Sequence, residues 1–117
     1  MNYLPGRHII ATLHSQNQDL LKIHSKLKAR VDQLINEFSL QKLGEVYHDF
    51  VPGGFTAVVC LSESHISIHT WPEHGLVNLD IYLSNFQRNN DGTVERIYGA
   101  IKEYFEATVS KEQMITR

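Results

Sequence analysis

The chain has 117 residues, a formal net charge of −2 at pH 7, and hydrophobic side chains at 42% of its positions. This balance is typical of a soluble globular protein, and the length suits one domain, 1–117, with one core. The sequence has no basic tract that would favour nucleic acid, and no apolar run near the ~20 residues that span a bilayer. The first residues lack a secretory h-region, and Cys60 alone allows no internal disulfide. We therefore expect a cytoplasmic protein without nucleic-acid or membrane partners.

The first part of the chain predicts a strand, a long helix and a second strand. Apolar and polar residues alternate from Arg7 to His14, as in a half-buried strand. Candidate N-caps at 15–19 precede apolar residues spaced by threes and fours, which predict a helix to about Phe38. A strand over Leu43–Val51 should then end at the turn Pro52-Gly53-Gly54.

The second part predicts three more strands, a helix and an edge strand. Phe55–Leu61 is rich in valine and has the composition of a buried strand. Ser64–Trp71 alternates again, and Leu76–Ser84 is the clearest alternation in the chain. Helical spacing returns from Thr93 to about Glu106, and the tail, Ala107–Thr116, fits a last edge strand.

Together these elements predict an α+β fold of the two-layer sandwich type, an antiparallel sheet with two helices on one face. Two helices cover only one face of such a sheet. The face left uncovered should be the polar one, which needs either water or a partner. Its expected residues are His65, Ser67, His69, Asp80 and Ser84.

One segment carries a specific resemblance. Residues 63–73 read ESHISIHTWPE, which matches without a gap the self-cleaving site of the S-adenosylmethionine decarboxylase family. The likeness extends to the segments 6–8, 50–56 and 80–82, so it covers most of the chain. The chain is therefore identified as a member of this pyruvoyl-dependent family, in its short prokaryotic form.

The resemblance implies that the chain cleaves itself. In the family pattern, Ser64 attacks the carbonyl of Glu63, and the resulting ester undergoes β-elimination. The chain then divides into 1–63, the β chain, and 64–117, the α chain. Residue 64 becomes a pyruvoyl group, a covalent cofactor whose ketone forms a Schiff base with the substrate amine and accepts electrons as carbon dioxide leaves. The implied enzyme is a carboxy-lyase that acts on S-adenosylmethionine in polyamine (spermidine) biosynthesis.

The resemblance also assigns helpers to this chemistry. His69 matches the base that removes the α-proton of residue 64, a role suited to an imidazole near neutral pH. Thr56 matches a hydroxyl residue that assists processing. Phe50 matches an aromatic residue that stacks on adenine, and Glu73 matches a glutamate that binds the ribose hydroxyls.

Two neighbouring positions depart from the family pattern. The family places a cysteine, its proton donor, where this chain has Ser84, and usually a glycine where it has Asn85. A thiol, whose pKa is about 8.5 in model peptides, is a much stronger acid than a hydroxyl. Reprotonation should then be slower, or depend on Tyr82 or water. Two alternatives stay open: a pyruvoyl-dependent ornithine or arginine decarboxylase, and a non-catalytic homologue that binds or regulates a partner.

The spacing of the motif favours a homodimer. Ser64 and His69 are five positions apart, so on one strand they would face opposite ways, about 16 Å from each other. We expect His69 and Thr56 of one chain to serve Ser64 and Ser84 of the other. His65 and His69 would be about 13 Å apart on the strand, too far to share a metal, so no metal site is expected.

Three residues near the motif are read as structural. We interpret His65 as a structural residue, Asp80 as the partner in a structural hydrogen bond, and Cys60 as a buried strand residue.

Overall fold

The computed structural model describes residues 3–86 and 88–117. Six strands and three α-helices follow one another with one short 3-10 helix, η1. Their order and bounds are β1 (Arg7–His14), α1 (Gln18–Lys22), α2 (Ser25–Glu37), β2 (Lys42–Asp49), β3 (Phe55–Leu61), β4 (Ser64–Trp71), η1 (Pro72–His74), β5 (Leu76–Leu83), α3 (Asp91–Tyr104) and β6 (Thr108–Thr116).

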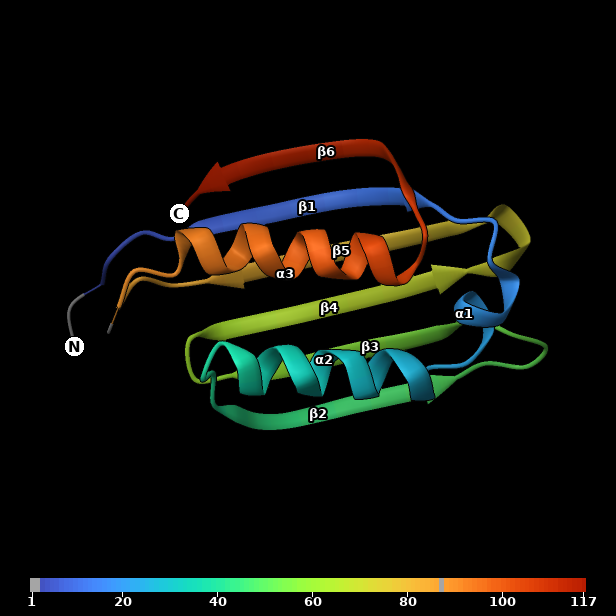
Figure 1. Ribbon diagram of the computed structural model, residues 1–117, viewed down its shortest axis with the longest axis horizontal. Helices are drawn as coiled ribbons and strands as arrows, with labels where there is room; N and C mark the ends of the chain where they lie inside the picture. The colour runs from blue at the N-terminus through green and yellow to red at the C-terminus, as the bar shows by residue number, and fades with distance from the viewer. Residues whose placement is uncertain (1–2, 87) are drawn as a thin grey trace.

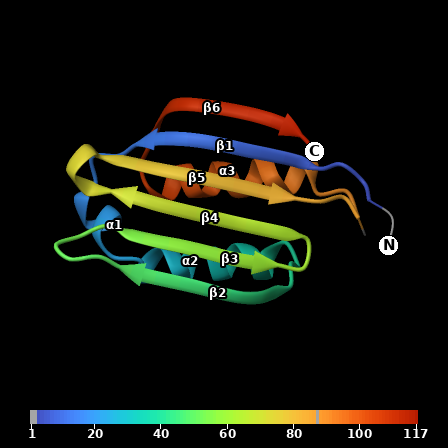
Figure 2. The ribbon, with the colours of Figure 1, turned by 180° about the vertical axis from the view of Figure 1, so that it is seen from behind.

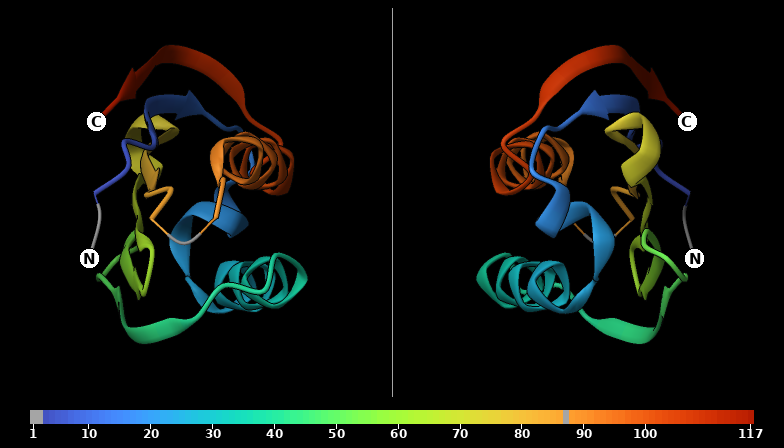
Figure 3. Two further views of the ribbon diagram at one scale, coloured as in Figure 1. Left: turned by 90° about the vertical axis from the view of Figure 1, so that its left-hand side faces the viewer. Right: turned by 90° about the vertical axis from the view of Figure 1, so that its right-hand side faces the viewer.

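The strands form one antiparallel sheet in the order β2-β3-β4-β5-β1-β6. The helices α2 and α3 lie side by side on one face of it (Figure 1). Seen along the strands, the sheet and these helices form two layers (Figure 3). From behind, the other face of the sheet is open (Figure 2). The predicted α+β two-layer sandwich is confirmed.

The core lies between the two layers. Every second residue of a strand points inward. Phe55, Ile66 and Ile81 are examples, and each is at most 1% exposed. The helices contribute their apolar stripes, with Leu27 and Val31 on α2 and Ile97 on α3 fully enclosed. This alternation is the reason that the sequence located most strands closely.

The expected single long helix is divided in two. Ile23 is extended, with φ −133° and ψ 140°, and separates α1 from α2. Here the amide and Nδ1 of His24 each lie 3.0 Å from Asp49 Oδ1, and the Lys22 carbonyl accepts the Gly54 N–H at 3.1 Å. These bonds to residues far away in the sequence replace hydrogen bonds within a helix. The break between α1 and α2 therefore results from tertiary contacts, which the spacing of apolar residues does not reveal.

The interpretation of Cys60 as buried was wrong. In β3 the inward residues are Phe55, Ala57, Val59 and Leu61, so Cys60 and Val58 project from the uncovered face and are exposed. The valine-rich composition suggested burial on both sides, whereas the helices cover only one. Among the described helices none is both long and apolar enough to cross a bilayer.

Candidate active site

The turn between β3 and β4 holds the first part of the site. Only Ser62 and Glu63 connect the two strands, and Ser64 follows with φ +143°. A residue with a side chain rarely adopts this positive φ, and such a conformation costs on the order of 1–3 kcal/mol. Backbone strain is thus concentrated at the Glu63–Ser64 peptide.

Two polar contacts flank this peptide. The carbonyl oxygen of Glu63 accepts the backbone N–H of Ser84 at 2.8 Å. The Ser64 hydroxyl lies 3.3 Å from His65 Nδ1. A fixed N–H on a carbonyl oxygen polarises the carbonyl and stabilises the negative charge of a tetrahedral intermediate. A hydroxyl group and a hydrogen-bond donor to the carbonyl oxygen thus both adjoin this peptide.

A pocket of about 300 Å³ opens beside the turn. Ser64 and Ser84 both line it, together with the ring of Tyr82. The remaining lining residues are Tyr3, Leu4, Leu61, Ser62, Glu63 and Phe86. Ser84, the position of the expected proton donor, thus shares one cavity with Ser64.

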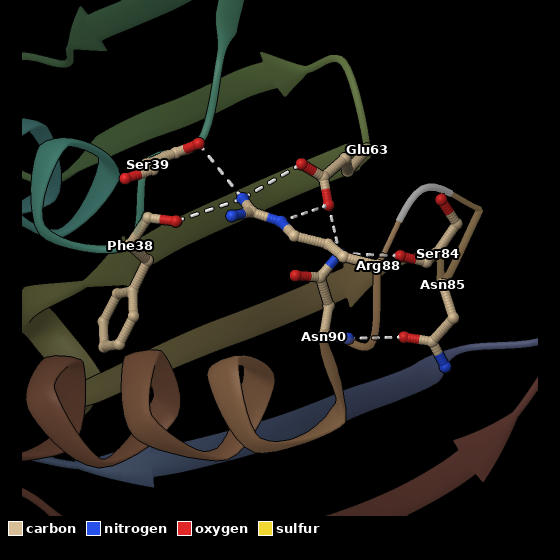
Figure 4. A network of polar contacts seen from close by, with 7 residues as sticks. All are labelled: Phe38, Ser39, Glu63, Ser84, Asn85, Arg88 and Asn90. Atoms are coloured by element: carbon tan, nitrogen blue, oxygen red, sulfur yellow. Dashed lines mark hydrogen bonds and ion pairs between the residues drawn. The ribbon is translucent and has the colours of Figure 1, made fainter.

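The carboxylate of Glu63 anchors the turn from inside (Figure 4). Glu63 is only 6% exposed, and its Oε1 accepts a bond from Arg88 at 3.1 Å. Asn90 donates to the other carboxylate oxygen and to the Ser84 carbonyl. A buried carboxylate needs such partners, so the network holds the turn and the Ser84 segment together.

Arg88 extends the network to the end of α2. The same guanidinium donates to the carbonyls of Phe38 and Ser39, at 3.0 and 3.1 Å. Arg88 and Asn90 were not predicted as site residues, because they lie outside the motif segments. A buried Glu63 in a two-residue turn is the signal that a cationic partner was needed.

A second cluster lies at the other end of β3 and β4. Thr56 Oγ1 and His69 Nδ1 are 3.0 Å apart, on cross-strand partners. They line a cavity of about 550 Å³ with Phe50 and Glu73. Its other lining residues are Pro52, Gly53, Phe55, Thr70 and Trp71. Phe50 is 51% exposed, so its ring is free to contact a ligand.

A third cluster, which we call the relay cluster, consists of His8, His65 and Asp80 on the uncovered face. Asp80 Oδ1 lies 2.5 Å from His8 Nε2 and 3.0 Å from His65 Nε2. The ligand-type atoms of these three residues lie within 4.8 Å of one another. Strand spacing relates His65 only to nearby positions such as His69, whereas the structure brings it to His8 and Asp80, 57 and 15 positions away.

Comparison with known proteins agrees with this arrangement. The family model described as S-adenosylmethionine decarboxylase matches residues 7–117. An S-adenosylmethionine decarboxylase proenzyme of Archaeoglobus fulgidus is 38% identical over 112 residues, which cover 96% of each chain. That of Picrophilus torridus is 36% identical over 102 residues, 87% of this chain and 78% of the relative.

The chain belongs to the S-adenosylmethionine decarboxylase family. A crystal structure titled as the adenosylmethionine decarboxylase of Aquifex aeolicus superposes with a TM-score of 0.78 and 28% identity. The superposition covers 100% of this chain and 91% of that one. The family resemblance read from residues 63–73 is thus confirmed, and the family fold with it.

The residues that the family pattern selects fall into two groups in one chain. Glu63, Ser64 and Ser84 meet at one end of β4. Thr56, His69, Phe50 and Glu73 meet at the other end. Ser64 and His69 remain five positions apart on one strand, about 16 Å at the usual rise. A single chain therefore does not bring its own serine and histidine together.

Gly6 allows the family's amino-terminal segment to approach Ser84. A Cβ at Gly6 would lie 2.1 Å from the Leu83 carbonyl oxygen and 3.0 Å from Ser84 Cα. We expect Gly6→Ala to lower the free energy of unfolding by about 1–3 kcal/mol, because backbone atoms must move to admit the methyl group. Thermal or denaturant unfolding measures this change.

Gly99→Ala provides the matched control. Gly99 lies within α3, and a Cβ there meets nothing within 4 Å. Alanine in a helix interior is favoured over glycine by about 0.5–1 kcal/mol, so this variant should be more stable than the parent. Equal effects of the two substitutions would show that the contact of Gly6 with Leu83 does not matter.

Proposed function

We propose that the protein is an S-adenosylmethionine decarboxylase that forms its own pyruvoyl group by cleavage at Glu63–Ser64. The observation that carries the proposal is the state of that peptide within the family motif. Ser64 has φ +143°, and the Glu63 carbonyl accepts the Ser84 N–H. Strain and a polarised carbonyl both favour attack by the Ser64 hydroxyl. Glu63, Ser64 and Ser84 therefore suit the formation of a pyruvoyl group, the covalent cofactor that the family requires.

The cleavage uses groups of the chain, and water enters in its last step. The Ser64 hydroxyl attacks the Glu63 carbonyl carbon, and the amide becomes an ester. Removal of the α-proton of residue 64 then breaks the Cβ–Oγ bond, so that Oγ leaves as part of the Glu63 carboxylate and residue 64 becomes dehydroalanine. The imine form of this residue takes up water and releases ammonia, which leaves the pyruvoyl carbonyl. His69 is the base that removes the α-proton, and its hydrogen bond with Thr56 orients the ring.

In the mature protein the pyruvoyl carbonyl at position 64 supplies an electron sink for decarboxylation. The residues that surround it are those of the pocket at the β3–β4 turn. Ser84 and Tyr82 offer hydroxyl groups there. Ser84 occupies the place of the proton donor, and its hydroxyl or a water that it holds returns a proton to the product.

The second cluster supports a nucleoside substrate. Its cavity of about 550 Å³ is large enough for a purine nucleoside and combines an exposed aromatic ring, Phe50, with a carboxylate, Glu73. An aromatic ring stacks on adenine, and a carboxylate accepts two bonds from a ribose diol. We therefore favour S-adenosylmethionine, and with it a cytoplasmic role in polyamine biosynthesis.

A homodimer would complete the site. The uncovered face carries a central cross-strand row with three exposed apolar residues, Val46, Val58 and Ile10. Ser67, Asp80 and Gln113 complete this row. One neighbouring row holds His65 and the other His69. A two-fold axis through the central row would exchange the two ends of β4 and place the His69 of one chain by the partner's Ser64.

The proposal is tested by the mass of the purified protein and by substrate turnover. Intact mass should show two chains, 1–63 and 64–117, the second carrying a pyruvoyl group that reacts with a carbonyl reagent. Labelled carbon dioxide should be released from S-adenosylmethionine. An uncleaved chain after long incubation would favour the non-catalytic homologue instead.

Ser84 supports a second candidate, a pyruvoyl-dependent decarboxylase of ornithine or arginine. We expect Ser84→Cys to raise kcat for S-adenosylmethionine about tenfold or more, because a thiol is a far stronger proton donor than a hydroxyl. Ser62→Cys, which adds a thiol to the same pocket at the exposed turn, is the control. No gain with Ser84→Cys, together with turnover of a basic amino acid, would favour the second candidate.

A further inference from the structure

The relay cluster offers a base for ester formation at Ser64. The family pattern assigns no base to this step. The first reaction of Ser64 is loss of its hydroxyl proton as the ester forms. His69 lies at the far end of β4 in the same chain, and its proposed role is the later elimination. His65, by contrast, is within 3.3 Å of the Ser64 hydroxyl.

Strand geometry alone would keep these two side chains apart. Consecutive residues of a regular strand point to opposite faces. The positive φ of Ser64 departs from that pattern, and the hydroxyl meets the imidazole of its neighbour. The same backbone strain that marks the scissile peptide therefore accompanies the contact between nucleophile and base.

The hydrogen bonds of the relay cluster determine where the protons lie. A guanidinium only donates, so Arg117, 3.2 Å away, makes His8 Nδ1 an acceptor and leaves the proton on Nε2. His8 then donates this proton to Asp80 Oδ1, 2.5 Å away. The carboxylate also accepts from His65 Nε2 at 3.0 Å. The lone pair of His65 is consequently on Nδ1, the atom nearest the Ser64 hydroxyl.

Burial and packing hold this arrangement. His8 is 4% exposed, while His65 and Asp80 are about one-third exposed. The ring of Tyr82 packs on both imidazoles, with centroid distances of 5.2 Å to His8 and 6.1 Å to His65. His8 is thus held by burial and by the Tyr82 ring, whereas the side chains of His65 and Asp80 remain partly open to solvent.

We propose that His65 is the catalytic base of ester formation at Ser64, positioned by Asp80 and His8. This assignment rests on the proposed self-cleavage. The side chains of Ser64, His65 and Asp80 would act as a nucleophile, a base and an orienting carboxylate. This combination of roles recurs on unrelated folds.

The step is balanced without any further reactant. His65 Nδ1 takes the hydroxyl proton as Ser64 Oγ bonds to the Glu63 carbonyl carbon. The oxyanion forms opposite the Ser84 N–H. His65 then gives the proton to the backbone nitrogen of Ser64 as the carbon–nitrogen bond breaks. The products are an ester and a free amine, and His65 returns to its starting form.

A metal would compete with this arrangement for the same atoms. A cation bound by all three relay residues would have to displace both hydrogen bonds to Asp80 Oδ1. The Arg117 guanidinium next to His8 adds a positive charge at the cluster. The hydrogen-bonded form is therefore favoured.

The test separates ester formation from elimination. His69→Ala should stop processing at the ester, which hydroxylamine cleaves to give a new chain that begins with an unmodified serine. In the double variant His65→Gln/His69→Ala, this hydroxylamine-dependent product should form about 100-fold or more slowly, a typical contribution of a general base. Glutamine retains a donor for Asp80 but offers no base. Intact mass measures the product, and thermal unfolding shows whether the variant is folded.

Three comparisons complete the design. His14→Gln/His69→Ala, altered at the exposed end of β1, should react as His69→Ala does. Asp80→Asn/His69→Ala should slow ester formation without loss of fold, because it removes the carboxylate that orients the imidazole. Zinc or EDTA should leave the rate unchanged, and a rate that depends on either would assign the cluster to a metal and overturn the proposal.

Failure of the base assignment and failure of the proposed function look different. If the unsubstituted chain cleaves and a folded His65→Gln chain cleaves equally fast, the base assignment is wrong while the function stands. If the unsubstituted chain never cleaves, both are overturned.

Discussion

Ser64→Ala should abolish cleavage of the chain, leaving a single polypeptide of 117 residues on a denaturing gel. The substitution removes the hydroxyl that, in the proposed mechanism, attacks the Glu63 carbonyl and then leaves in the elimination. The alternative, attack by water on an amide, is slower by many orders of magnitude. The variant should fold, because Ser64 is only partly buried and its hydroxyl is bonded to His65 alone among the described residues.

Ser62→Ala is the control for this experiment. Ser62 is exposed in the same turn, two positions before Ser64. This variant should cleave at the rate of the unsubstituted chain. A Ser64→Ala chain that still divides between residues 63 and 64 would remove the basis for the pyruvoyl group and for the decarboxylase proposal.

Two inactive variants should restore cleavage to each other when they are produced together. Ser64→Ala keeps a working His69, and His69→Ala keeps a working Ser64. In a mixed dimer with shared sites, one site combines the intact Ser64 with the intact His69, and the other has neither. With random pairing, about half of the His69→Ala chains should be cleaved and none of the Ser64→Ala chains.

The two substitutions give the chains different masses, so the cleaved species can be assigned directly. Each variant produced alone should remain uncleaved, or stop at the ester for His69→Ala. If mixed dimers form, as native mass shows, and no chain is cleaved, Ser64 does not depend on the partner's His69. The site would then lie within one chain after a rearrangement of β4.

The strands could be predicted closely because one helical layer imposes a strict alternation on them. β3 and β4 have the predicted bounds, and β5 differs by one residue. The helix after β1 was predicted without its break, since the bonds of His24 to Asp49 and of Lys22 to Gly54 join segments far apart in sequence. Periodicity reports which residues face the core, and both α1 and α2 face it.

Some residues of the candidate site could be predicted from the sequence, and others could not. The residues on β3, β4 and η1 were found through the motif, because consecutive positions in a match need no knowledge of the fold. His8, Arg88 and Asn90 were missed as site residues, since their roles arise from contacts across 25 positions or more, as with Arg88 and Glu63. Among the residues predicted for the uncovered face, only His65 pointed toward this cluster, and the burial of Glu63 became visible only in the structure.

The amino-acid sequence alone was sufficient to identify the family, the two layers and the face of the sheet that stays uncovered, and it predicted the peptide at which the chain is proposed to cleave. These follow from local order: an ungapped motif, and apolar residues at the spacing of strands and helices. The tertiary structure decided which groups surround the peptide, from the positive φ of Ser64 to the Ser84 amide and the relay cluster. The physical reason is that hydrogen bonds between strands distant in the chain depend on sheet order and register, which alternation does not encode.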